Sequence, residues 1–410
     1  MRRRILTGGA VGLALVLALA ACGSAEPDEP AAATARSLVV WVDEARAAAL
    51  EELAGPYGAK AGVAIDVVPQ TSETLRDDYV RAVAQGEGPD VLVGAHDWLG
   101  ELVTNGVVQP VEIAEPDAFA PAAVGAMTYD GVTYGTPLSI ESVALVRNDA
   151  LATTTPATFD EVVAQGQELV AAGRATRPLL VQQGEGGDPY HLYPVQTSFG
   201  APAFRADEEG SYTTELALGG EAGHAFAEFL GSLADRDVLD PAVTSDVATQ
   251  GFLAGESPYV LTGPWSTAAF VEAGMDITVL PVPPAGDLPA QPFVGVQGAF
   301  VNNLSLHQDE ARAFVGDFLA TPEAQLALYR ATSRAPALTA ALEQITDDPI
   351  TTGFADAGAQ GAPMPAVPQM GMVWLYWGST EAAIARGEGD PAALWDQMVQ
   401  NIEASIAAEL

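Results

Sequence analysis

Cysteine and lysine are almost absent from this 410-residue chain, since each occurs once, as Cys22 and Lys60. One cysteine cannot form an internal disulfide, and it offers no cluster for a zinc or iron–sulfur site. The sequence also lacks a Gly-x4-Gly-Lys-Ser/Thr loop and a His-Glu-x-x-His segment, so nothing in it indicates a nucleotide-dependent or metal-dependent enzyme. We therefore expect no cofactor, no metal, and a fold stabilised by packing alone.

Positive charge is also scarce. The chain has 17 Lys and Arg against 54 Asp and Glu, which gives a formal net charge of −37. Such a surface repels phosphate backbones, so we expect no nucleic-acid partner, and it disfavours polyanionic ligands while allowing neutral ones. An adaptation for solubility or salt is the alternative explanation of this charge.

A long apolar run occurs only at the start of the chain. Three arginines precede the small, apolar residues 5–21, and Leu19-Ala20-Ala21 leads directly into Cys22. A cationic head, a short apolar stretch and small residues before a cut are typical of an export signal rather than a spanning helix. The Arg3-Arg4 pair also fits a twin-arginine signal, so the general and the twin-arginine export routes both stay open.

The Leu-Ala-Ala-Cys segment resembles the lipobox of bacterial lipoproteins. This resemblance implies that residues 1–21 are a signal peptide and that Cys22 becomes a diacylglycerol-bearing, palmitate-type anchor; an ordinary core or membrane cysteine is the alternative. Residues 22–36 are rich in Ala, Pro, Glu and Asp, which is typical of a flexible tether. We expect an extracytoplasmic protein that is lipid-anchored to the cell membrane.

The rest of the chain is long enough for two domains, and its apolar pattern predicts α/β structure. Continuous apolar or β-branched runs alternate with helical spacing, which indicates parallel βαβ units. We expect strands at 38–42, 63–68, 90–93, 135–146, 178–181, 259–261, 277–280 and 293–296, and helices at 44–54, 73–84, 159–172 and 220–233. Long helices at 307–319 and 322–330 then begin a helical C-terminal part.

Residues just past strand ends are the ones to examine for binding, because ligands of open parallel sheets lie at the carboxyl ends of strands. These positions hold acidic residues, one arginine and aromatic rings, namely Asp43, Glu44, Arg46, Asp97, Trp98, Glu141, Asp188, Tyr190, Trp265, Trp374 and Trp377. Aromatic rings can cover the apolar face of a pyranose, and carboxylates accept hydrogen bonds from its hydroxyls. The mixture therefore favours a neutral carbohydrate.

Several of these side chains have plainer interpretations. Trp41 lies inside a predicted strand and Trp395 at helical spacing, so both are expected in the core. The four histidines are scattered singly, which favours structural roles. Asp97 is equally suited to binding and to capping a helix.

An ordered set of motifs resembles the maltose/maltodextrin-binding proteins of ABC transporters. The motifs are Leu38-Val39-Val40-Trp41, Gly86 to Asp90, Ala95-His96-Asp97, Gly263-Pro264-Trp265, Pro292 to Val296 and Met364 to Met370. The resemblance covers residues 37–410. It implies a two-lobe periplasmic-binding-protein-like fold with three crossovers, near Leu138–Ser142, Gln291–Gly295 and Ser333–Ala337. The N-terminal lobe would hold 37–139 and 295–334, and the C-terminal lobe 140–294 and 335–410.

The same resemblance assigns roles to individual residues. Asp97 and Glu141 match polar contacts to sugar hydroxyls, while Tyr190, Trp265 and Trp374 match aromatic platforms. Asp188 stands beside the tyrosine where the family often has Glu, and Arg46 lies near a family Lys.

The chain also departs from the family pattern. Gly94 replaces an aromatic residue, Trp98 and Gly378 replace basic residues, and Ala45 stands where an acidic contact is common. Glu44 or Asp43 is expected to substitute for that contact. Stacking at the first subsite is expected from Trp98 or Trp377. Maltose and maltodextrins lead as ligands, with trehalose or another α-glucoside as alternatives.

The resulting hypothesis is a monomeric, non-enzymatic ABC-transporter component that captures an oligosaccharide between two lobes and delivers it to permease subunits. An extracellular glycoside hydrolase acting on α-glucans is the first alternative, which needs two carboxylates about 5–9 Å apart around one bond. Asp97 with Glu141 or Asp188 are the carboxylates available for that role. A surface adhesin that binds no small molecule is a third class.

Overall fold

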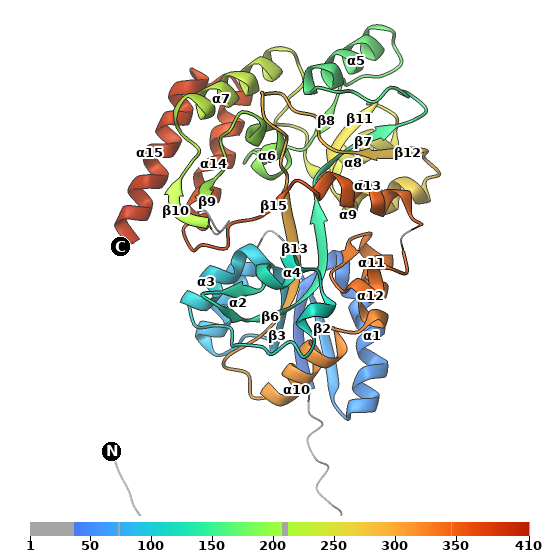
Figure 1. The fold of residues 1–410 in the computed structure, drawn as a ribbon, viewed down its shortest axis with the longest axis vertical. Coiled ribbons are helices and arrows are strands. Elements are labelled where there is room, and N and C mark those ends of the chain that lie inside the picture. The colour runs from blue at the N-terminus through green and yellow to red at the C-terminus, as the bar shows by residue number, and fades with distance from the viewer. Residues whose placement is uncertain (1–36, 73, 207–211, 346, 410) are drawn as a thin grey trace, which may run out of the picture. The chain divides into compact units, whose positions relative to one another are not determined.

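The computed structural model describes residues 37–409 apart from 73, 207–211 and 346 (Figure 1). The expected signal peptide, Cys22 and the tether lie outside these residues. Among the helices of the described part, none is both long and apolar enough to cross a membrane.

A seven-stranded mixed sheet organises the first lobe, with the strand order β14-β6-β13-β3-β1-β2 and with β15 paired to β13. The parallel β1–β2 and β1–β3 pairs confirm the predicted βαβ units, whereas β13 runs antiparallel to both β3 and β6. The strands are β1 (Ser37–Asp43), β2 (Ala64–Gln70), β3 (Val91–Ala95), β6 (Gly135–Ser142), β13 (Phe293–Val301), β14 (Ala335–Pro336) and β15 (Ala362–Pro363).

The first helix is longer than the sequence predicted. It runs over α1 (Glu44–Ala61) and includes Pro56, so the predicted end near Gly55-Pro56 was wrong. A proline inside a helix removes one backbone hydrogen bond but need not end the helix. The helix ends instead at Gly62, which has φ +71° and whose N–H reaches the carbonyl of Gly58, because a left-handed glycine reverses the chain there.

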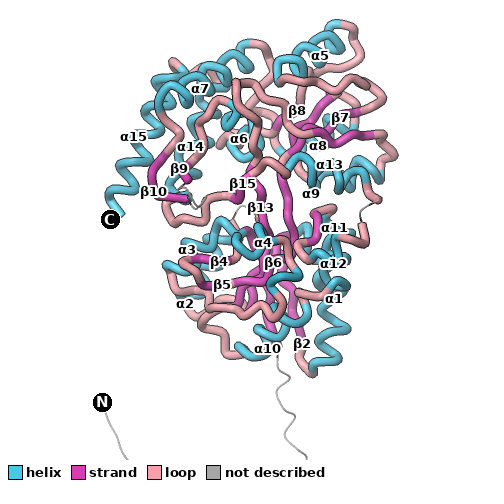
Figure 2. Tube along the Cα trace, viewed as in Figure 1, coloured by secondary structure: helices cyan, strands magenta, loops and turns pink. Residues whose placement is uncertain are grey.

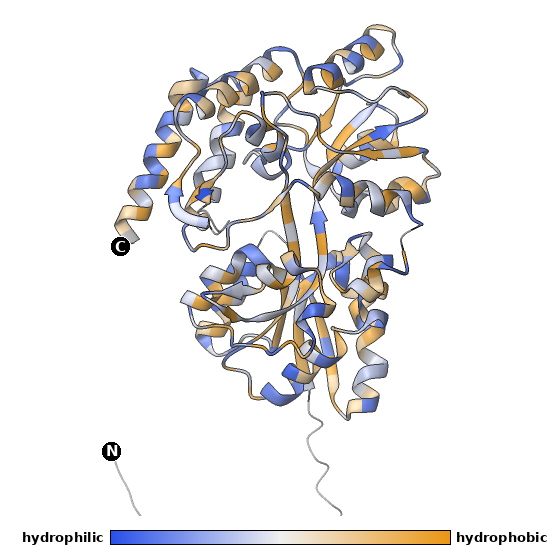
Figure 3. Ribbon diagram, viewed as in Figure 1, coloured by the Kyte–Doolittle hydropathy of each residue, from blue (hydrophilic) through white to orange (hydrophobic). Residues whose placement is uncertain are grey.

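A four-stranded sheet, ordered β12-β7-β11-β8, organises the second lobe. Here β11 is parallel to β8 but antiparallel to β7. The strands are β7 (Ala144–Asn148), β8 (Leu180–Val181), β11 (Tyr259–Thr262) and β12 (Ile277–Leu280). Figure 2 shows the helices flanking both sets of strands, and Figure 3 shows that the strands are mostly apolar while the helices carry polar and apolar faces.

The remaining elements complete the two lobes. Those near the first sheet are α2 (Leu75–Gln85), η1 (His96–Trp98), α3 (Leu99–Thr104), η2 (Pro116–Ala118), α4 (Pro121–Ala126), β4 (Thr128–Tyr129), β5 (Val132–Thr133), α10 (Gln308–Arg312), the π-helical η3 (Ala313–Phe318), α11 (Pro322–Thr332) and α12 (Thr339–Leu342). Those near the second sheet are α5 (Phe159–Ala171), α6 (Pro189–Ser198), β9 (Phe204–Ala206), β10 (Tyr212–Leu216), α7 (Gly220–Asp235), α8 (Ser245–Leu253), α9 (Pro264–Glu272), α13 (Pro349–Gly358), α14 (Met370–Ala385) and α15 (Pro391–Glu409).

Two neighbouring strands join the lobes. The run predicted as one strand over 135–146 is two strands, because β6 ends at Ser142 and β7 starts at Ala144 in the other sheet. Strand β13 places Phe293 in the core of the second lobe and Phe300 in a core of the first. The strands β6 and β13 pair with each other up to Ser142 and Val294.

The third connection lies later in the chain than Ser333–Ala337. Leu338 and Ala341 pack with Val296 in the first lobe. Phe354 and Ala357 of α13 pack with Val279 in the second lobe. The chain therefore changes from the core of the first lobe to that of the second between Ala341 and Phe354.

The helical C-terminal part closes the core of the second lobe. Trp395 of α15 is completely buried, and its indole N–H donates to the carbonyl of Leu218. This confirms the expectation that Trp395 is a core residue. Trp41 is partly buried against a core of the first lobe.

Candidate functional site

Candidate residues from both lobes meet where β6 and β13 pass between the sheets. The first lobe brings Arg46 at the start of α1, Asp97 in η1 and Glu141 near the end of β6. The second lobe brings Tyr190 in α6, Trp265 in α9 and Trp374 in α14. A Cβ on Gly295 would lie 2.9 Å from Glu141 Cγ and 3.3 Å from the Tyr190 hydroxyl oxygen, so these two side chains lie close to the same point of β13.

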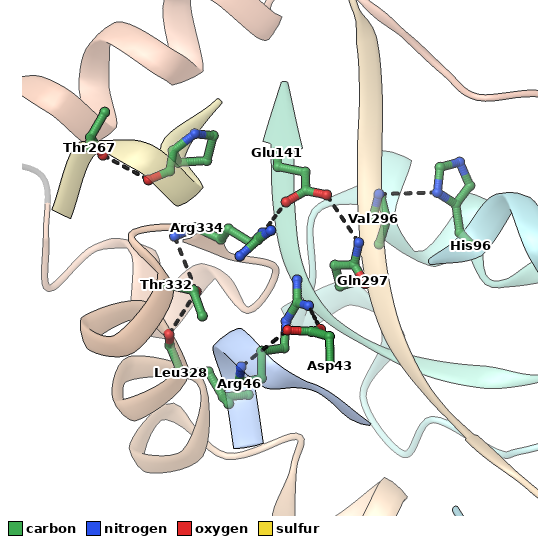
Figure 4. Close-up of polar contacts among 11 residues, drawn as sticks. Asp43, Arg46, His96, Glu141, Thr267, Val296, Gln297, Leu328, Thr332 and Arg334 are labelled. Atoms are coloured by element: carbon green, nitrogen blue, oxygen red, sulfur yellow. Dashed lines mark hydrogen bonds and ion pairs between the residues drawn. The ribbon is translucent and has the colours of Figure 1, made fainter. Parts of the chain in front are cut away.

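Glu141 is the centre of the charged network in Figure 4. One carboxylate oxygen accepts from Gln297 at 3.0 Å, and the other pairs with the guanidinium of Arg334. Burial works to raise the pKa of Glu141, but the charges of Arg334 and Arg46 with these hydrogen bonds hold it below its usual value. Glu141 is therefore an ionised acceptor inside the junction.

Arg46 forms a second buried ion pair. Asp43 caps α1 by accepting from the backbone N–H of Arg46 at 3.2 Å, and the same carboxylate pairs with the Arg46 guanidinium. Burial lowers the pKa of Arg46, as does the nearby charge of Arg334, while Asp43 partly offsets both effects. Asp43 was one of two residues expected to replace the acidic contact that is missing at Ala45, but its carboxylate is paired with Arg46 within the protein. The other, Glu44, is exposed beside it.

Three aromatic rings form a cluster on the second-lobe side. The centres of the Tyr190 and Trp265 rings are 6.2 Å apart, and the ring of Phe293 is 6.2 Å from Tyr190. Burial and the charge of Glu141 raise the pKa of Tyr190 well above its usual range, so its hydroxyl stays neutral. This cluster offers flat apolar surface directly beside the charged network.

Asp97 and Trp374 connect the two lobes. The side chain of Trp374 lies close to the Asp97 carboxyl, which is also within the fields of Arg76 and Glu141. Burial raises the pKa of Asp97 to about 6. Trp374 also stacks at 5.4 Å on Trp377 and meets Phe293 edge-on at 6.1 Å.

His96, next to Asp97, is structural. Its Nδ1 accepts from the backbone N–H of Val296 at 3.1 Å, and its Nε2 faces the carbonyl of Met364 at 3.2 Å. This pairing requires a neutral ring with the proton on Nε2. Burial lowers the pKa of His96 to about 4.

Two expected contacts, Asp188 and Trp377, are engaged inside the protein. Asp188 caps α6 and accepts from the backbone and ring of His191 and from Gln182, so its carboxylate is used within the second lobe. Trp377 is completely buried against Tyr193 and Phe293. It therefore offers no free face, in contrast to the expectation that it supplies stacking.

Trp98 is explained by its neighbour Gly94. A Cβ on Gly94 would overlap the indole ring of Trp98, so the ring occupies the space that a larger residue at position 94 would need. The two departures from the family pattern are therefore sterically linked, because the tryptophan at position 98 fits only where position 94 has no side chain. The glycine at position 378 also has a steric explanation, because a Cβ there would lie 2.5 Å from the carbonyl oxygen of Gly186.

Four polar atoms at the junction and one just before α14 are buried and have no hydrogen-bond partner in the described protein. The donors are Arg46 Nη2, Arg334 Nη1 and the Tyr190 hydroxyl, and the acceptors are Asp97 Oδ1 and Gln369 Oε1. Leaving such groups unpaired costs about 1–3 kcal/mol each. Their arrangement suits a ligand that both donates and accepts, as a hydroxyl group does.

Sequence reasoning missed Arg334, Gln297 and Gln369. Arg334 follows a helix rather than a strand, so a search past strand ends does not reach it. The sequence feature that could have indicated Arg334 is its position in the predicted third crossover. A basic residue there, in a very acidic chain, is expected to pair with an acidic residue.

Two hollows lie near this region. A cavity of about 220 Å³ borders Glu141 on the side of α13 and is lined mostly by apolar residues of both lobes. A wider groove of about 920 Å³ lies between α1 and α11 and contains none of the candidate residues.

The chain belongs to the family of bacterial extracellular solute-binding proteins, whose model matches residues 52–353. This family consists of binding proteins rather than enzymes, and the glycoside hydrolase alternative is not supported.

Solved and curated relatives agree with this assignment. A maltotriose-binding protein of Thermus thermophilus, solved with maltotriose, has a TM-score of 0.82 and 30% identity over 90% of this chain and 100% of that chain. The chain is 27% identical to a maltooligosaccharide ABC transporter solute-binding lipoprotein of Streptococcus pneumoniae R6, over 89% of this chain and 88% of the relative. It is 25% identical to a galactooligosaccharide-binding protein of Bacillus subtilis, over 97% and 96%. The fold is therefore the two-lobe α/β fold of solute-binding proteins, as predicted.

Proposed function

We propose that this chain is the solute-binding component of an ABC transporter and captures maltooligosaccharides between its two lobes. The observation that carries the proposal is the meeting of unpartnered donors, unpartnered acceptors and aromatic rings at one junction. Rings can stack on the apolar faces of glucose units, while Asp97, Tyr190 and the two arginines bind hydroxyls. The names of the Thermus and pneumococcal relatives support the ligand class.

In this proposal, sugar binding is coupled to closure of the lobes. The charged partners lie on the first lobe and most aromatic partners on the second, so a ligand makes both sets of contacts only when the lobes are together. We place the lobe boundaries at Val143, at Pro292 and within 343–348, where the chain passes between the two cores.

Galactooligosaccharides are the second candidate ligand, because one relative carries that name over nearly the whole chain. Isothermal titration with maltose, maltotriose, maltotetraose, trehalose and a β-galactotriose separates the candidates. We expect saturable binding of maltotriose and maltotetraose with the highest affinity. Binding of the galactotriose alone would contradict the maltooligosaccharide assignment.

The partners and location follow from the same proposal. The closed, loaded monomer would dock on permease subunits outside the cytoplasm, held there by a lipid on Cys22 after removal of residues 1–21. A lipoprotein relative supports the anchor. Mass spectrometry of the mature N-terminus should find diacylglycerol on Cys22, and Cys22→Ser should move the protein from the membrane to the soluble fraction. An unmodified cysteine in the membrane-bound protein would contradict the anchor.

A further inference from the structure

Arg334 reaches from the first lobe into the junction on a fixed backbone. It follows Ser333, a residue with φ +54° that ends α11, and it precedes Ala335, which pairs with Ile140 of β6. Its backbone N–H faces the hydroxyl of Thr332, which in turn donates to the carbonyl of Leu328 at 2.8 Å (Figure 4). The base of the side chain is therefore held on both sides.

The guanidinium of Arg334 makes two contacts with residues of the candidate site. Its Nε pairs with Glu141, and its central carbon lies 5.4 Å from the centre of the Trp265 ring. Trp265 belongs to α9 of the second lobe, so this cation–π contact spans the two lobes. One indole face is thereby covered, which limits the face on which a sugar ring can stack.

A third part of the guanidinium remains free. Nη1 of Arg334 is buried and has no hydrogen-bond partner, and its side chain lies within the electrostatic reach of Tyr190 and Asp43. Burial works to lower the pKa of Arg334, but the charge and hydrogen bond of Glu141, together with the charges of Asp43 and Tyr190, raise it, so the side chain stays charged. A fixed, charged donor pointing away from its own partner needs an acceptor oxygen.

We propose that Arg334 is a specificity-determining residue whose Nη1 donates to an oxygen of the bound oligosaccharide while its guanidinium holds Trp265 for stacking from one side. The inference rests on the proposed function, because it assigns a contact within the same site. A role solely as counter-ion to Glu141 is the competing explanation. A lysine at 334 keeps the charge but loses the planar fork that reaches Glu141, Trp265 and a ligand together.

The test is isothermal titration of Arg334→Lys with maltotriose and maltotetraose, with Arg147→Lys as the matched control. Arg147 is also buried and pairs with Asp149 at 2.6 Å, but it lies in the second sheet outside the site. We expect Arg334→Lys to weaken binding at least about tenfold, as for the loss of a hydrogen bond to a charged group. Arg147→Lys should bind within about twofold of the unmodified chain.

Thermal unfolding without sugar separates a structural role from a binding role. The proposal expects the two lysine variants to lose comparable stability while only Arg334→Lys loses affinity. Affinity within twofold of the unmodified chain for Arg334→Lys, or equal losses for both variants, would overturn it. Failure of the unmodified chain to bind any maltooligosaccharide would overturn the proposed function together with this inference.

Discussion

The two lobes contribute different chemistry to the junction. The first lobe supplies charged groups held in ion pairs, namely Arg46 with Asp43 and Arg334 with Glu141. The second lobe supplies the rings of Tyr190, Trp265 and Trp374. Charged groups in buried pairs affect folding as well as binding, whereas partly exposed rings affect mainly binding. Variants in the two lobes should therefore separate stability from affinity.

The largest expected effect is on the charged side, in Glu141→Ala. Removing this carboxylate leaves two buried guanidiniums without their shared attraction, and breaking a buried pair costs about 3–5 kcal/mol. Urea unfolding measures the loss. The control is Glu215→Ala, whose partner Arg205 is exposed, so its effect should stay within about 0.5 kcal/mol. Equal effects at the two sites would contradict the buried network.

The second effect concerns the neighbours His96 and Asp97, whose pKa shifts act in opposite directions on stability. Asp97 has its pKa raised to about 6, so its contribution falls as pH rises from about 4 to 6. His96 has its pKa lowered to about 4, so its contribution falls as pH drops from about 6.5 to 4. The two dependences nearly cancel, because each amounts to roughly 3 kcal/mol across the window.

Replacing Asp97 or His96 alone should reveal the pH dependence of stability that the other residue contributes. Asp97→Asn should make stability rise with pH between 4 and 6.5, relative to the unmodified chain, and His96→Gln should make it fall. Urea unfolding at pH 4.5, 5.5 and 6.5 measures both slopes. Slopes unchanged by either variant would show that these groups titrate normally.

The third effect belongs to the aromatic side. Trp265→Ala and Trp374→Ala should each weaken maltotriose binding by about 1–3 kcal/mol, as for central aromatic contacts. Leu375→Ala is the matched control, since Leu375 adjoins Trp374 but is 62% exposed. Titration calorimetry gives the affinities. Unchanged affinity in both tryptophan variants would remove these rings from the site.

The last prediction concerns Trp98, an aromatic residue that lies in the first lobe, which otherwise supplies the charged groups. Gly94→Ala should cost about 1–3 kcal/mol, because the new Cβ overlaps the indole ring. In a Trp98→Ala background the same change should cost much less. A double-mutant cycle by thermal unfolding measures this coupling, and additive effects would show that the two positions are independent.

Strand periodicity predicted much of the fold, because buried parallel strands leave continuous apolar runs. Positions past strand ends then located Arg46, Asp97, Glu141, Tyr190 and Trp265, which the structure brings together. A search of positions past strand ends does not find Arg334, because this residue follows a helix.

Other features depend on contacts between distant segments, which a local pattern does not contain. The burial of Trp377 is set by its packing against Phe293, and the third crossing is set by Leu338 and Ala341 packing beside Val296. The end of α1 was predicted at Pro56, but the helix continues to Gly62. A rule that treats every proline or glycine as a turn signal cannot tell which of the two ends the helix.

The pairing of β6 with β13 has a mechanical consequence. Because these strands stay hydrogen-bonded to each other up to Ser142 and Val294, the first two connections leave the first sheet side by side. In the closure proposed above, these two neighbouring connections would restrict the movement of one lobe to a rotation about a shared axis. In that proposal, chemically different solutes would all lead to the same closed arrangement of the lobes, which a single permease could recognise.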